Sequence, residues 1–102
     1  MLYENGALDA NLAAAAGDDA VLMAELRGAF AGSLARQLDL LKRSRCDGNW
    51  GVAAMRLKGL AASFHAVDLI VLADEALASA PGEPTVIRKM EAFLSDFTGQ
   101  PA

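Results

Sequence analysis

A regular spacing of large apolar residues over residues 22–41 constrains the fold of this chain more than any other feature. The apolar residues recur at intervals of three or four, the repeat of one face of an α-helix, and they are Leu22, Leu26, Phe30, Leu34, Leu38 and Leu41. Asp18 or Asp19 can cap such a helix at its start. The pattern therefore predicts one long helix that runs to about Arg45.

Two shorter patterns flank this helix. Leu8 and Leu12 stand four positions apart before Gly17, which predicts a short first helix that ends at a glycine. Residues 46–49 are typical of a turn, and a third helix is expected over residues 49–64. Either Asn49 or Asp47 can cap that helix, because both side chains accept hydrogen bonds from backbone N–H groups.

The last third of the chain predicts two more helices. A fourth helix follows from about Val67 and stops near Ala80, where a Pro-Gly pair interrupts the pattern. A fifth begins at Pro84 and ends at Gly99 and Pro101. The connections are short, which favours antiparallel neighbours. We therefore predict an all-α fold, an antiparallel up-and-down four-helix bundle with a short additional N-terminal helix.

The composition agrees with a single domain over residues 1–102, with a flexible N-terminus over residues 1–6. Apolar residues make up 54% of the chain and charged residues 22%, which argues against disorder. The formal net charge of -4 argues against nucleic acid as a partner. Cys46 is the only cysteine, as expected of a protein in a reducing compartment. No apolar run reaches the length of a membrane span, and we expect a cytoplasmic protein.

The third predicted helix has an unusual outer face. At 100° per residue, one stripe gathers the side chains expected to face the bundle, namely Trp50, Ala53, Ala54, Leu57, Leu60, Ala61 and Phe64. The opposite face carries Gly51, Val52, Met55, Gly59, Ala62 and Ser63, flanked by Arg56 and Lys58. A solvent-facing helix surface usually carries more charge, and Gly59 inside a helix costs about 1 kcal/mol relative to Ala. Either Gly59 lets a partner approach closely, or it packs against a neighbouring helix of the same bundle.

The sequence around Met55 resembles the signature of histidine-containing phosphotransfer (HPt) domains. That signature reads Ala-His-x-Leu-Lys-Gly-Ser-Ala, followed by a hydrophobic residue, Gly, Ala and a later Leu. Residues 54–61 read Ala-Met-Arg-Leu-Lys-Gly-Leu-Ala, and Phe64-His65-Ala66 and Leu69 follow. The resemblance covers nearly the whole chain, and the fold that it implies is the predicted bundle.

In HPt domains of bacterial two-component signalling, the histidine exchanges a phosphoryl group with an aspartate of a response-regulator receiver domain. Met55 stands at that position, and a thioether has no basic nitrogen that could form a phosphoramidate. The resemblance implies that Lys58, used near the phosphoryl group, and Gly59, which lets the receiver approach, are kept for contact. Leu60 and His65 depart from the family, which has a small polar residue and a Gly there.

We therefore expect a pseudo-HPt domain that binds a receiver domain or a histidine kinase without carrying phosphate. The residues expected to make this contact are Val52, Met55, Arg56, Lys58, Gly59 and Ala62. One His and one Cys form no zinc site or nucleophile pair, so we expect no metal, no catalytic residue and no enzymatic activity. We also expect a monomer with no cofactor and no membrane partner. Two alternatives stay open: phosphotransfer through His65, and a structural module whose outer stripe seals a homodimer.

Overall fold

The computed structural model describes residues 6–99, and within that range the chain forms five helices and no strand. The helices are α1 (Gly6–Ala16), α2 (Ala20–Arg43), α3 (Asp47–Ser63), α4 (Val67–Leu77) and α5 (Pro84–Thr98). The predicted all-helical class is confirmed. The N-terminus expected to be flexible is residues 1–6, of which residues 1–5 lie outside the described residues and Gly6 begins α1. Pro101, predicted to follow the last helix, also lies outside the described residues.

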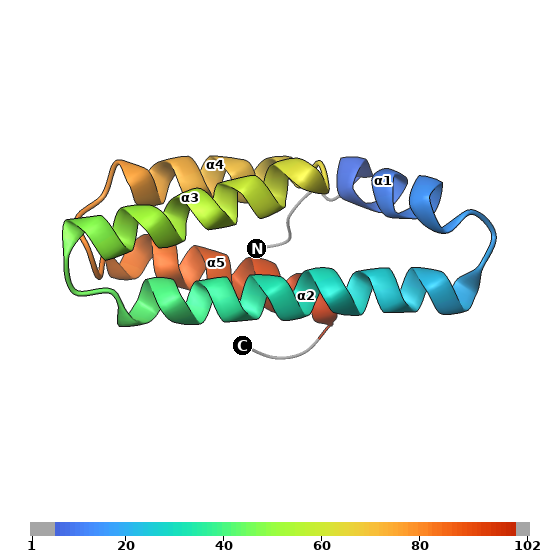
Figure 1. Ribbon diagram of the computed structural model, residues 1–102, viewed down its shortest axis with the longest axis horizontal. Coiled ribbons are helices and arrows are strands. Elements are labelled where there is room, and N and C mark those ends of the chain that lie inside the picture. Colours follow the sequence, from blue (N-terminus) through green and yellow to red (C-terminus); the bar gives the residue numbers. More distant parts are fainter. Residues whose placement is uncertain (1–5, 100–102) are drawn as a thin grey trace.

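The helices form an elongated bundle along α2, with principal extents of 44 × 24 × 19 Å. α2 packs against α1, α3 and α5, and α4 packs against α3 and α5. In Figure 1, α3, α4 and α5 gather along the C-terminal half of α2, whereas α1 lies over its N-terminal half. α3 therefore has α2 on one side and α4 on the other.

The turn between α1 and α2 follows the predicted chemistry. Gly17 adopts the left-handed conformation (φ 64°), and its N–H donates to the Ala13 carbonyl at 2.9 Å. The Asp19 carboxylate accepts hydrogen bonds from the N–H groups of Val21 (2.9 Å) and Leu22 (3.0 Å). Of the two candidate N-cap residues, Asp19 is therefore the one that caps α2.

α2 ends at Arg43, two residues before the predicted end at Arg45. Ser44 leaves the helical conformation, and its hydroxyl donates to the Leu40 carbonyl at 2.7 Å. The Arg45 guanidinium donates to the Lys42 carbonyl at 3.1 Å. These two side chains bond carbonyls that the end of the helix leaves without a backbone donor.

α4 is also shorter than predicted, ending at Leu77 and not near Ala80. The Ser79 hydroxyl donates to the Glu75 carbonyl at 2.7 Å, which helps to terminate the helix before the Pro-Gly pair. In α5, Glu83 is the N-cap and accepts from the Thr85 N–H at 3.0 Å, a hydrogen bond that lowers the pKa of Glu83. Gly99 ends α5 in the left-handed conformation (φ 73°).

The core contains large side chains from every helix. Phe30 is central, because its ring makes edge contacts with Phe64 (centroids 5.0 Å apart) and Phe97 (5.1 Å). Leu8 and Leu12 bury α1 against this end of the bundle. In the described part of the chain, no helix has the length and apolar character that a membrane span requires.

Candidate functional site

The candidate site is the outer face of α3, and its position depends on how that helix begins. α3 starts at Asp47, with Cys46 as an N-cap whose side chain makes no capping hydrogen bond. The predicted caps, Asn49 and Asp47, are therefore wrong, and both residues lie within the helix. Trp50 anchors this end instead, because its buried indole N–H donates to the Ala76 carbonyl of α4 at 2.7 Å.

The predicted division of α3 into two faces agrees with the observed burial. Trp50, Ala53, Ala54, Leu57 and Ala61 are buried, while Leu60 and Phe64 are partly buried and pack against the core. On the other face Val52 is 52% exposed and Met55 55%, and the remaining exposed members are Gly59, Ala62 and Ser63. Gly51 is half-buried. Two large apolar side chains thus project into solvent from an otherwise small-residue surface.

The glycines of this face are not required by packing within the molecule. A Cβ atom at Gly59 would have no packing neighbour within 4 Å, and the same holds at Gly48 and Gly51. The interpretation that Gly59 packs against another helix of the bundle is therefore wrong. The cost of about 1 kcal/mol for each glycine inside a helix is not offset by a close contact inside the described structure.

The two cations that flank the face differ in their surroundings. Lys58 Nζ lies 2.8 Å from Asp74 Oδ1 of α4, and both side chains are about half exposed. Arg56 is exposed and makes no ion pair with residues 6–99. Of the two expected binding cations, Arg56 is therefore the one whose charge is available to a partner.

Two hollows border the N-terminal half of α3. The first is a shallow, open hollow of about 550 Å³, which we call the α3–α4 groove; it is lined by Asp47, Gly48, Gly51, Val52, Met55, Arg56 and Leu77. The second, of about 360 Å³, lies between α2 and α3 and is lined by Leu40, Arg43, Ser44, Asn49, Val52, Ala53 and Arg56. Val52 and Arg56 line both, so they form the ridge that separates the hollows.

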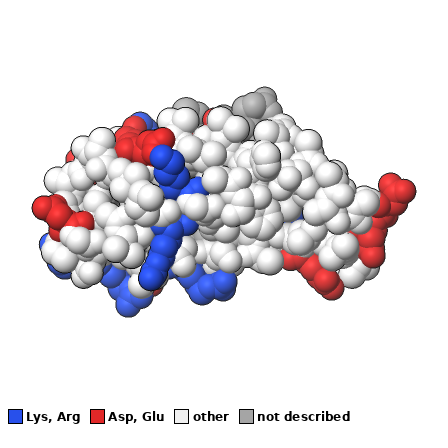
Figure 2. Space-filling model, turned by 45° about the horizontal axis from the view of Figure 1, so that its top comes forward, with Lys and Arg blue, Asp and Glu red and all other residues white. Residues whose placement is uncertain are grey.

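Figure 2 shows how charge is distributed over the side of the molecule that includes α3 and α4. Basic side chains cross the half that holds the turn between α2 and α3, acidic side chains lie beside them in the same half, and further acidic side chains lie at the opposite end. Much of the surface between them is uncharged. This side of the molecule thus has a large uncharged surface with basic side chains across one half, although the chain as a whole is acidic.

Sequence reasoning missed three residues of the α3–α4 groove, namely Gly48, Asp47 and Leu77. The sequence pattern indicates turn residues at Asp47 and Gly48, whereas both belong to the first turn of α3. Leu77 belongs to α4 and is 38% exposed, so it reaches the groove from a different helix. The apolar spacing of α4 predicted a helix but not which of its residues would face α3.

His65 occupies a defined backbone position just after α3. Its φ is 58°, in the left-handed region. The Ala66 N–H donates to the Ala61 carbonyl at 2.8 Å, and the His65 N–H donates to the Ala62 carbonyl at 3.3 Å. These two bonds form a Schellman motif, in which the left-handed residue is usually Gly. The motif assigns His65 a structural setting at the end of α3.

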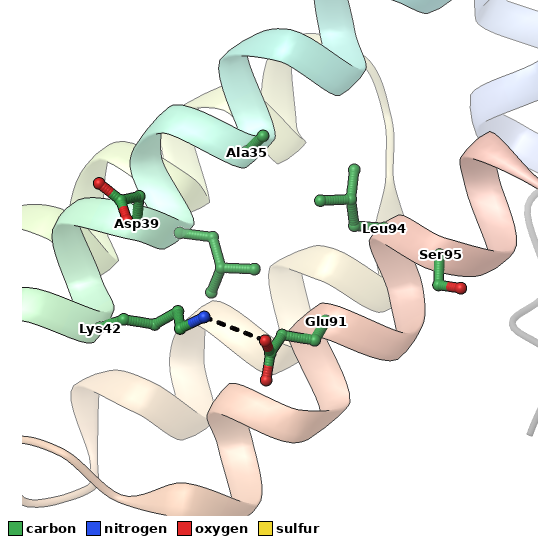
Figure 3. Close-up of a pocket in the computed structure, with 7 residues that line it drawn as sticks. Ala35, Asp39, Lys42, Glu91, Leu94 and Ser95 are labelled. Atoms are coloured by element: carbon green, nitrogen blue, oxygen red, sulfur yellow. Dashed lines mark hydrogen bonds and ion pairs between the residues drawn. The ribbon is translucent and has the colours of Figure 1, made fainter. Parts of the chain in front are cut away.

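A further hollow lies between α2 and α5, away from the outer face of α3 (Figure 3). It has a volume of about 310 Å³ and is lined by Ala35, Leu38, Asp39, Lys42, Glu91, Leu94 and Ser95. Lys42 Nζ and Glu91 Oε2 are paired across it at 3.1 Å. Over residues 6–99, no group of three or more His, Cys, Asp and Glu side chains could hold a metal ion.

Comparison with known proteins adds no assignment to this geometry. No family model matches the chain, and no curated protein or solved structure matches it significantly. The function is therefore argued from the α3 face itself and from the sequence resemblance.

Proposed function

We propose that this protein is an HPt-like adaptor of phosphorelay signalling that binds a receiver domain or a histidine kinase through the outer face of α3. In this proposal the five helices include an antiparallel four-helix bundle of the HPt type, formed by α2 to α5 and capped by α1. The protein acts in the cytoplasm as a monomer and carries no phosphoryl group at the position of the family's histidine.

The observation that carries the proposal is the solvent-exposed apolar surface on α3 at the position of the HPt signature. Val52 and Met55 are both more than half exposed. Methionine is flexible and polarisable, and it is favoured at surfaces that bind other proteins. Burial of these side chains by a partner would supply the apolar centre of an interface.

Charge gives the surface a preference among partners. The receiver's phosphorylation site is an acidic pocket, and Arg56 beside Met55 offers a guanidinium that is not paired within residues 6–99. Lys58, held by Asp74, contributes less free charge. A small apolar centre with one free cation supports a transient complex, in which the protein occupies the partner and competes with phosphate-carrying HPt proteins.

Titration calorimetry against purified receiver domains and histidine kinases from the same genome tests this proposal. Gly59→Arg and Arg56→Glu should weaken binding at least tenfold, because they block the face and reverse its free charge. Gly28→Arg is the matched control, since Gly28 is an exposed glycine of α2 with no packing neighbour within 4 Å of its Cβ position. Binding that is unaffected by both α3 variants, or no binding to any of these domains, would reject the proposal.

The same protein preparations test the two alternatives. Labelling by a phosphorylated receiver that is lost in His65→Gln would support phosphotransfer through His65. A molar mass in light scattering that rises with protein concentration would support a homodimer sealed by the α3 face. We expect neither label nor self-association.

A further inference from the structure

We propose that the hollow between α2 and α3 binds a small phosphomonoester with an apolar ester group, whose phosphate is held by Arg43, Arg56 and Asn49. This α2–α3 hollow has a volume of about 360 Å³. That volume is near the lower end of the range of about 300 to 1,000 Å³ that is typical of small-molecule sites. Neither the HPt signature nor the proposed contact with a receiver requires such a site.

The lining of the α2–α3 hollow carries positive charge and no carboxylate. Its polar side chains are those of Arg43, Ser44, Asn49 and Arg56. The α3–α4 groove and the hollow between α2 and α5 are each lined by at least one acidic side chain. In a chain with 13 acidic and 9 basic residues, a lining with two guanidinium groups reverses the overall balance. Two guanidinium groups match a phosphomonoester, which carries a charge of about -1.5 to -2 at pH 7.

Arg56 supplies the cation on the α3 side of this hollow. It is exposed and makes no ion pair with residues 6–99. Asp47, the one acidic residue of α3, is nine positions away, or roughly 13 Å along the helix. The Arg56 guanidinium can therefore donate two parallel hydrogen bonds to phosphate oxygens.

Arg43 supplies the cation on the α2 side and already has a carboxylate beside it. Its Nη2 lies 3.0 Å from Oδ2 of Asp39, one turn earlier in α2. The two side chains are 67% and 61% exposed, and ion pairs in such surroundings contribute little to stability. Asp39 lines the hollow between α2 and α5 and not the α2–α3 hollow. A phosphate with nearly twice the charge of a carboxylate should displace Asp39 from Arg43.

The rest of the lining suits the other parts of such a ligand. The Asn49 side chain is exposed and makes no hydrogen bond with residues 6–99, so its amide can donate to a phosphate oxygen. Leu40 and Val52 are 37% and 52% exposed and supply apolar surface on the two sides of the hollow. An ester group of several carbon atoms would bury this surface, whereas inorganic phosphate would leave it in water.

Titration of the full chain with phenyl phosphate, followed by amide NMR spectra, tests the site. Saturable shifts should be largest at Asn49, Val52 and Arg56. Inorganic phosphate lacks the apolar group and phenol lacks the charge, so each should bind at least tenfold more weakly than phenyl phosphate. Inorganic phosphate that binds as tightly would overturn the ester group. Shifts centred elsewhere, or no saturable shift up to about 20 mM phenyl phosphate, would overturn the site.

Three glutamine variants separate the hollow from the general charge of this end of the molecule. Arg43→Gln and Arg56→Gln should each weaken phenyl phosphate binding about tenfold. Arg45→Gln is the matched control, because Arg45 is exposed in the turn between α2 and α3 and does not line the hollow. It should weaken binding less than threefold. Equal losses in all three variants would show that the anion responds only to the net charge of the turn, and would overturn the site. No receiver is present in these titrations, so their outcome is independent of the proposed function.

Discussion

Lys58 Nζ and Asp74 Oδ1 lie 2.8 Å apart, so the lysine that the HPt signature shares is joined to the neighbouring helix of its own chain. Both side chains are about half exposed, and such pairs contribute about 0 to 1 kcal/mol to folding. Lys58 thus connects α3 to α4 beside the face on which partner contact is proposed. Its positive charge is partly balanced before any partner arrives.

Exchanging the two charges distinguishes the contribution of the ion pair to stability from the effect of the charge at position 58 alone. Lys58→Asp alone places two carboxylates together and should lower the free energy of unfolding by about 1 kcal/mol. The double variant Lys58→Asp with Asp74→Lys restores an opposite pair and should recover most of this loss. Urea denaturation followed by circular dichroism measures both effects. A double variant as unstable as the single one would show that the pair makes no contribution.

Gly59→Ala should stabilise the protein. The Cβ would enter open space, and alanine inside a helix is favoured over glycine by about 0.5 to 1 kcal/mol. Gly28→Ala on α2 is the control, because Gly28 has equally open surroundings and lies on another helix. Thermal unfolding should show a higher Tm for both variants. A lower Tm for Gly59→Ala alone would mean that the outer face of α3 is not open in solution.

Trp50→Phe should destabilise the protein because Trp50 joins the start of α3 to the end of α4. The buried indole N–H donates to the Ala76 carbonyl at 2.7 Å, and Phe supplies neither the donor nor the second ring. Loss of a buried hydrogen bond together with ring volume costs about 1 to 3 kcal/mol. Denaturant unfolding measures this cost. An unchanged midpoint would contradict the contact between Trp50 and α4.

The helices could be predicted from the sequence because their signals are local. The apolar repeat of α2 and the glycine that ends α5 each influence the backbone only a few residues away. Both the long helix and the glycine at the end of α5 are found at the predicted positions. The N-cap of α3 could not be predicted in this way. The turn residues indicate Asn49 or Asp47 as the cap, whereas the helix begins after Cys46, whose side chain makes no capping hydrogen bond. Its start is fixed by Trp50, whose partner lies on another helix.

The candidate site could be predicted only in part for the same reason. Helical periodicity correctly placed Val52 and Met55 on an exposed face, since orientation around one helix depends on that helix alone. The pairing of Lys58 with Asp74 and the contribution of Leu77 to the groove depend on how α3 and α4 are aligned. Nothing in the spacing of either helix specifies that alignment.

His65→Gly should stabilise the turn between α3 and α4. His65 has φ 58°, a conformation that costs a residue with a side chain about 1 kcal/mol and that glycine adopts freely. We expect an increase in unfolding free energy of about 0.5 to 1 kcal/mol. His65→Ala serves as the control, because alanine keeps the strain and should give no such increase. Equal stabilities of the Gly and Ala variants would argue against the Schellman motif.

Met55→His tests the relation to HPt domains most directly. Met55 is 55% exposed, so an imidazole at this position would project into solvent from α3. If a receiver docks here, its aspartyl phosphate can transfer the phosphoryl group to an imidazole nitrogen, which methionine's thioether cannot accept. We expect a receiver phosphorylated with a radiolabelled small phosphodonor to label Met55→His and not the unmodified protein. His65→Gln in the same background should leave the label in place. A Met55→His variant that binds the receiver but stays unlabelled would mean that this face is not presented to the receiver's aspartate in the HPt manner.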